Sequence, residues 1–76
     1  MAFGPFKIKA NLRETIIAGP TAANAFLRSL GPEHRDTYQW KVVERMLEVA
    51  WMSEDSENLA ARAFKIALET DNFLIG

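Results

Sequence analysis

The sequence predicts an all-α protein: a small bundle of three to four short helices with a long central helix and an extended N-terminal arm. Two observations support this class. Apolar residues recur at intervals of three and four through several stretches, which is the period of an amphipathic helix. All three prolines follow a glycine, and a Gly-Pro pair can end one helix and open the next. We therefore expect a single helical domain over residues 1–76.

Four helices are expected, at residues 11–18, 21–30, 33–52 and 57–70. The first has Asn11 as a candidate N-cap, and Glu14 follows it three residues later, which is the spacing of a capping box. The second carries an apolar stripe that includes Phe26 and Leu27. The pair Gly31-Pro32 separates the second helix from the third. The turn-forming stretch SEDSEN separates the third from the fourth.

The two ends of the chain are expected to be non-helical. Residues 1–10 are expected to be extended, because the stretch FKIKANL, residues 6–12, alternates apolar and polar residues with the period of a β-strand. Because no second alternating run is evident, we interpret this segment as an extended arm, which could add to the sheet of a partner. Residues 71–76 form an apolar tail that packs either on the chain itself or on a partner.

The third helix has an unusually wide apolar surface. On a helical wheel, residues 40–52 give an apolar arc of about 200°, against about 100° for an ordinary surface helix. Trp40 and Trp51 lie together at one edge of this arc, and Met52 strays onto the polar side. One neighbouring helix cannot cover so wide an arc, so we expect the second and fourth helices to pack on either side.

Part of this region resembles the tetratricopeptide repeat, a helical hairpin of 34 residues. Leu47 and Trp51 match the leucine and the aromatic position of its first helix, and Ala60 with Phe64 matches its A-x₃-F motif. Other residues replace the Trp, Gly and Pro of the pattern: Glu44, Glu48 and Asn72. No second copy lies 34 residues earlier, so a generic alanine-rich helical hairpin is the simpler interpretation.

Composition argues against several function classes. The chain has no cysteine, which excludes disulfides and thiolate metal sites. Nine basic and ten acidic residues leave no basic excess, so we do not expect nucleic acid as a partner. No stretch approaches the roughly 20 apolar residues of a membrane span, and the N-terminus lacks the pattern of a secretory signal. We therefore expect a cytoplasmic protein without a membrane segment.

No catalytic, metal or cofactor motif is evident. The stretch EHRD at residues 33–36 is the most polar, but successive side chains on a helix point in different directions and do not converge on a substrate. We interpret this stretch as the solvated start of a helix. We interpret Glu44 and Glu48 as a solvated face, because Lys41 and Arg45 lie beside them. We expect no enzyme activity, no bound metal and no cofactor.

The sequence best fits a small non-enzymatic protein that binds another protein or itself, as a regulator, inhibitor or assembly subunit. The expected contact residues are large and apolar: Phe3, Phe6, Trp40, Trp51, Met52, Phe73 and Leu74. An alternative is a small-ligand or nucleotide binder around Gly31-Pro32, with these residues at the site: Arg28, His34, Arg35 and Tyr38. A less favoured alternative is a helix-turn-helix-like DNA binder, although the polar face of the third helix is no more basic than acidic.

Overall fold

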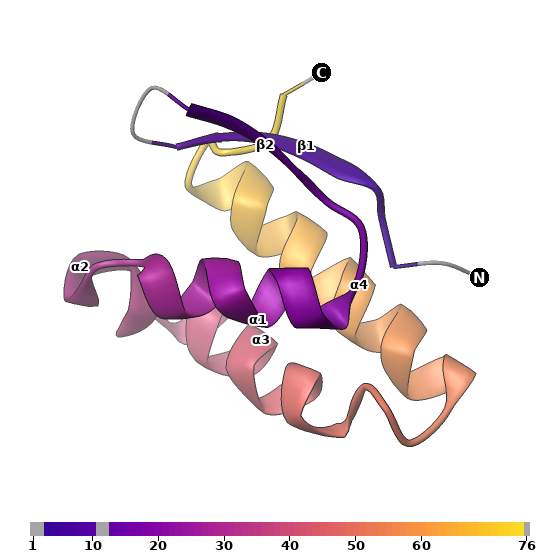
Figure 1. The fold of residues 1–76 in the computed structure, drawn as a ribbon. Coiled ribbons are helices and arrows are strands. Elements are labelled where there is room, and N and C mark those ends of the chain that lie inside the picture. The colour runs from indigo at the N-terminus through magenta and orange to yellow at the C-terminus, as the bar shows by residue number, and fades with distance from the viewer. Residues whose placement is uncertain (1–2, 11–12, 76) are drawn as a thin grey trace.

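The computed structural model describes residues 3–10 and 13–75 and corrects the predicted fold class. The chain order of the elements is β1 (Phe6–Ala10), β2 (Arg13–Ile17), α1 (Pro20–Ser29), α2 (Pro32–Arg35), α3 (Tyr38–Val49) and α4 (Glu54–Thr70). The prediction of an all-α protein is wrong, because a two-stranded antiparallel sheet precedes the helices (Figure 1). The protein is therefore a mixed α/β structure in which helices predominate.

The second strand replaces the helix that was predicted over residues 11–18. Strand β2 pairs antiparallel with β1, in a register that runs from Phe6 opposite Ile17 to Ala10 opposite Arg13. The sequence RETII of β2 ends in three β-branched residues, which favour a pleated strand. An isolated helix of this length would be marginal, whereas pairing with β1 satisfies the backbone groups of alternate residues along β2. Asn11, the expected helix cap, lies outside the described residues.

The C-terminal segment continues the sheet on the other side of β1. The backbone N–H of Lys9 donates to the carbonyl oxygen of Phe73 at 2.8 Å, and the N–H of Ile75 donates to that of Lys7 at 2.9 Å. Leu74 forms an antiparallel bridge with Ile8. Residues 6–10 of the predicted extended arm are therefore a strand held between β2 and the C-terminal segment of the same chain.

The helix that was predicted over residues 33–52 is divided into α2 and α3. Thr37 takes an extended backbone conformation between them, with φ −78° and ψ 157°. Its hydroxyl donates to the carbonyl oxygen of His34 at 2.6 Å, which satisfies a backbone acceptor at the end of α2. Helix α3 has 12 residues and ends at Val49. The predicted long central helix is therefore absent from the described residues.

Helix α4 is the longest of these elements, with 17 residues, and begins three residues before its predicted start. The backbone N–H of Ser56 donates to the hydroxyl of Ser53 at 3.1 Å, so Ser53 is the N-cap. Three acidic residues in the first turn also favour this start, through the helix dipole: Glu54, Asp55 and Glu57. A strong cap thus starts α4 soon after the end of α3.

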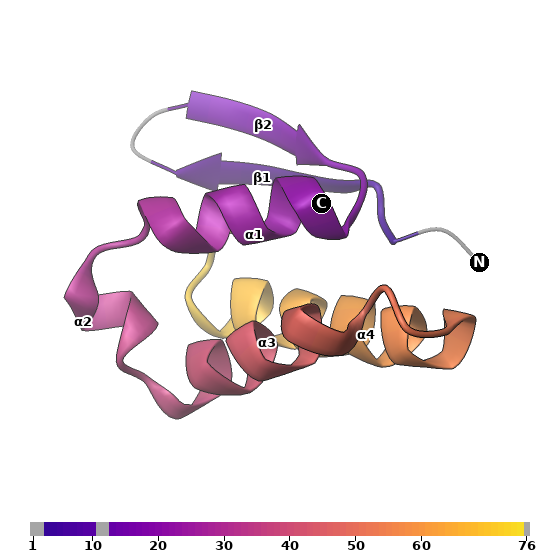
Figure 2. The same cartoon turned by 60° about the horizontal axis from the view of Figure 1, so that its bottom comes forward.

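Helix α3 packs against both α1 and α4, as its wide apolar arc indicates. Figure 2 shows α3 and α4 side by side, and Figure 1 shows the β-hairpin lying over the C-terminal half of α4. Buried alanines on α4 let its neighbours approach closely: Ala60, Ala61 and Ala67. The hydrophobic core lies where these helices meet the inner face of the hairpin.

The ring of Phe64, on α4, is the centre of an aromatic cluster. Its centroid lies 5.6 Å from the ring of Phe3, 5.8 Å from Phe6, 6.1 Å from Phe26 and 5.9 Å from Trp40. These four rings come from the N-terminal segment, β1, α1 and α3. Aromatic pairs at such separations contribute about 0.5–1.5 kcal/mol beyond the burial of their area. One side chain therefore joins the sheet to the helices.

Gly4 allows Phe3 to reach this cluster. Its φ of 85° lies in the region that favours glycine, and a Cβ at this position would collide with the carbonyl oxygen of Ile17. The turn directs the ring of Phe3 into the core.

Proline substitutions in β2 test the register of the sheet. Lys7 and Lys9 direct their backbone groups toward the C-terminal segment, so Ile8 between them directs its own toward β2. The backbone N–H and C=O of Thr15, the partner of Ile8, then point toward β1. The backbone groups of Ile16 point away from β1, toward the edge that no described strand covers. We expect Thr15→Pro to lower the free energy of unfolding by about 3 kcal/mol, and Ile16→Pro to cost less than about half as much, because proline is tolerated at a free edge.

Urea denaturation followed by far-UV circular dichroism measures both losses. Equal losses for the two variants would contradict the register.

Candidate functional site

Five of the seven apolar residues that were expected to contact a partner belong instead to the protein's own core. Phe3 and Trp40 have only 1% of their surface exposed, so neither side chain is available on the surface. Phe6, Phe73 and Leu74 are partly buried and pack against the core. Because the hairpin and the C-terminal segment close over α4, these residues stabilise the fold.

The other two expected contact residues, Trp51 and Met52, are exposed. Trp51 has 82% of its surface exposed and Met52 has 62%. Helix α3 ends at Val49, and the chain turns there, with the N–H of Met52 donating to the carbonyl oxygen of Val49 at 3.0 Å. A helical wheel places Trp51 beside Trp40, but the turn carries Trp51 out to the surface.

The indole ring of Trp51 is held in a defined orientation. Its Nε1–H donates to the backbone carbonyl oxygen of Glu48 at 2.9 Å. This carbonyl lies in the last turn of α3, where backbone acceptors lack partners within the helix. The bond satisfies the polar group of the indole inside the protein itself. What Trp51 presents to solvent is therefore an apolar surface.

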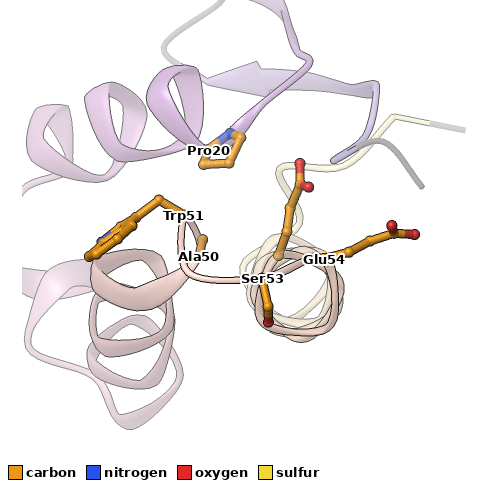
Figure 3. Close-up of a pocket in the computed structure, with 6 residues that line it drawn as sticks. Pro20, Ala50, Trp51, Ser53 and Glu54 are labelled. Atoms are coloured by element: carbon orange, nitrogen blue, oxygen red, sulfur yellow. The ribbon is translucent and has the colours of Figure 1, made fainter.

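Two adjoining hollows flank Trp51, and together we call them the Trp51 groove. The first has a volume of about 410 Å³ and is lined by Pro20, Ala50, Trp51, Ser53, Glu54 and Glu57 (Figure 3). The second, of about 420 Å³, lies between α1 and α3 and is lined by Pro20, Thr21, Asn24, Arg28, Glu44, Leu47, Glu48 and Trp51. Pro20 and Trp51 line both hollows, so the groove is built around this pair.

The Trp51 groove has an apolar floor and a predominantly acidic rim. Pro20, Leu47 and Trp51 contribute the apolar surface. Four glutamates line the two hollows, whereas Arg28 is the one basic residue among their lining side chains. Sequence reasoning interpreted two of these glutamates, Glu44 and Glu48, as part of a solvated face, because the groove forms only where α1 and α3 lie side by side.

The four residues of the alternative ligand site do not share one hollow. Arg28 lines the Trp51 groove, whereas His34 lines a separate hollow of about 210 Å³. Arg35 lines a third and has its guanidinium 3.4 Å from the carboxylate of Glu44. Tyr38, at the start of α3, is 80% exposed. The His34 hollow is smaller than the roughly 300–1,000 Å³ of typical small-molecule sites.

Asp71 forms a polar cluster that sequence reasoning did not detect. One oxygen of its carboxylate, Oδ2, accepts a hydrogen bond from the indole N–H of Trp40 at 2.5 Å and lies 3.0 Å from Nδ1 of His34. A carboxylate only accepts hydrogen bonds, so Nδ1 of His34 is the donor. The His34 ring also lies 5.1 Å from that of Phe73. The cluster ties α2 and α3 to the end of α4 and serves the fold.

Metal binding and membrane insertion find no support in the described part of the chain. Among residues 3–10 and 13–75, no three histidine or acidic side chains are grouped so that they could hold a metal ion. No helix within these ranges is both long enough and apolar enough to cross a bilayer.

No family model, curated protein or solved structure matches the chain. The resemblance to a tetratricopeptide repeat therefore gains no support from these comparisons. Leu47, Ala60 and Phe64 are buried as in a helical hairpin, but Trp51 is exposed beyond the end of α3. The candidate site has to be interpreted from its own geometry.

Substitution of Asp71 tests its structural role. We expect Asp71→Ala to lower the free energy of unfolding by about 2–3 kcal/mol, because the buried indole N–H of Trp40 loses its acceptor. We expect Asp71→Asn to cost less, because its amide oxygen can still accept from Trp40. Urea denaturation in a Trp51→Phe background measures the effect, since Trp40 is then the one fluorescent tryptophan. A loss below about 0.5 kcal/mol for Asp71→Ala would show that the cluster is dispensable.

Proposed function

We propose that the chain is a small non-enzymatic protein that binds another protein through the Trp51 groove, as a regulator, inhibitor or assembly subunit. One observation carries the proposal: Trp51 is exposed while its indole N–H is bonded to the protein itself. A large side chain with no unsatisfied polar group gains most when a partner covers its apolar surface.

The orientation of Trp51 favours binding further. Tryptophan is enriched among the residues that dominate binding energy at protein interfaces. A side chain that is already held in place loses little conformational entropy on binding. Trp51 is held by its bond to Glu48, and the exposed apolar side chains of Val49 and Met52 belong to residues within two positions of it in the sequence. This surface is therefore preorganised for binding.

The contents of the groove argue for binding rather than catalysis. General acid–base chemistry most often uses histidine, close to the reacting atoms. His34 is the one histidine of the chain, and it is bonded to Asp71 and lines a different hollow. In the groove, Glu44 faces the guanidinium of Arg35. The proposal therefore needs no catalytic residue and no cofactor.

Selection from a displayed library of random 16-residue peptides tests the proposal, with the wild-type protein as bait. We expect the enriched peptides to bind Trp51→Ala at least about tenfold more weakly than the wild type, because the substitution removes the apolar anchor. The free energy of unfolding should change by less than about 0.5 kcal/mol, because the side chain is exposed. Isothermal titration calorimetry measures the binding constants.

Tyr38→Ala is the matched control, since Tyr38 is an equally exposed aromatic residue outside the Trp51 groove. It should leave binding unchanged within about twofold. Peptides that bind Trp51→Ala as well as the wild type, or a selection without enrichment, would contradict the proposal.

A further inference from the structure

The Trp51 groove has a shape that can accommodate an α-helix. Helix α1 contributes Thr21, Asn24 and Arg28, and α3 contributes Glu44 and Leu47, with Trp51 just beyond its end. These spacings of three, four and seven residues place each set on one face of its helix. At 1.5 Å per residue, each wall is about 10–12 Å long, or about two helical turns. A trough between two helices is a common seat for an amphipathic helix.

The groove runs between two helices of opposite direction. Pro20 begins α1, and it lines both hollows together with Trp51, which follows the end of α3. The wall residues farthest from Pro20 and Trp51 along their helices, Arg28 and Glu44, come from the late part of α1 and the middle of α3. The apolar anchor therefore lies at the Pro20 end of the groove.

The charges of the rim determine which partner surface fits the Trp51 end of the groove. Glu48 lines the hollow on one side of Trp51, and Glu57 lines the hollow on the other. Arg28 lies along α1, two turns from Pro20, so the Trp51 end itself is acidic. Complementary charge at the rim of an interface steers and orients a partner. The matching surface has an apolar stripe flanked by lysine or arginine.

We infer that the partner presents a basic amphipathic helix to the Trp51 groove. This inference rests on the proposed function. An apolar side chain of that helix covers Trp51 and Leu47, and its lysine or arginine side chains face Glu48 and Glu57. Two turns of the partner helix fill the trough between α1 and α3.

A second copy of this chain is the competing occupant. The exposed face of α4 carries Leu59 and Ile66, seven residues apart, with the exposed basic residues Arg62 and Lys65 between them. The same helix also exposes Asp55 and Glu69, which offset these two basic charges and would face the acidic rim unfavourably. The charges therefore favour a more uniformly basic helix from another protein.

Two synthetic 16-residue peptides test the inference. Both place leucine at helical positions i, i+3, i+4 and i+7, and the remaining positions are lysine in one peptide and glutamate in the other. We expect the lysine peptide to bind the wild-type protein at least about tenfold more tightly than the glutamate peptide, because its charges complement the rim. Anisotropy of a fluorescent label on each peptide measures the affinities.

A charge-matched pair of variants separates the groove from general attraction. We expect Glu48→Gln/Glu57→Gln to weaken binding of the lysine peptide by about tenfold or more. Glu33→Gln/Glu69→Gln makes the same change in net charge outside the groove and should alter binding by less than about twofold. Equal weakening by both pairs would overturn the inference, because binding would then follow net charge alone.

The outcomes also separate this inference from the proposed function. Library peptides that need Trp51 but are acidic or neutral would overturn the basic helix and leave the protein-binding proposal standing. If no peptide binds in a way that depends on Trp51, both the inference and the protein-binding proposal are overturned. A dimer in light scattering that Trp51→Ala converts to a monomer would assign the groove to a second copy, and so would also overturn the inference.

Discussion

The position of Phe64 is the constraint on which the rest of the fold depends. Its ring contacts rings from the N-terminal segment, β1, α1 and α3, so it is the place where the sheet and the helices share one core. Replacement of a buried phenylalanine by alanine costs about 3–5 kcal/mol in general, which is most of the stability that a single core of this size supplies. The small residues around it on α4 follow from this role: Ala60, Ala61 and Ala67 leave room for the rings that converge on Phe64.

The sequence alone predicts those parts of the fold that depend on local periodicity. The apolar stripe of residues 21–30 lies within one residue of α1, and the end of α4 at Thr70 agrees with the prediction. Strand β2 could not be predicted in this way, because Asn11 and Glu14 imitate a helix cap and the partner strand determines the structure of a five-residue segment. The C-terminal segment pairs with β1 across more than sixty residues, and no local pattern indicates such a contact.

The candidate site was predicted only in part, for a related reason. The helical wheel marked Trp51 and Met52, but it treated residues 40–52 as one continuous helix. The end of α3 at Val49 breaks that continuity, so Trp40 enters the core while Trp51 turns outward. The walls of the Trp51 groove come from two helices, and their contact is visible only in three dimensions. The cluster around Asp71 joins residues 31 and 37 positions apart and is hidden from sequence reasoning in the same way.

The hydrogen bonds between β1 and residues 73–75 determine when the sheet can be completed as the chain is synthesised. A ribosome makes β1 about sixty residues before the segment that covers its second edge. Until that segment emerges, the edge of β1 next to it has unpaired backbone groups, as does any uncovered strand. The hairpin and the helices can form beforehand, but the sheet closes only when the residues after α4 arrive. The sheet therefore closes late, when residues 73–75 pair with a strand made about sixty residues before them.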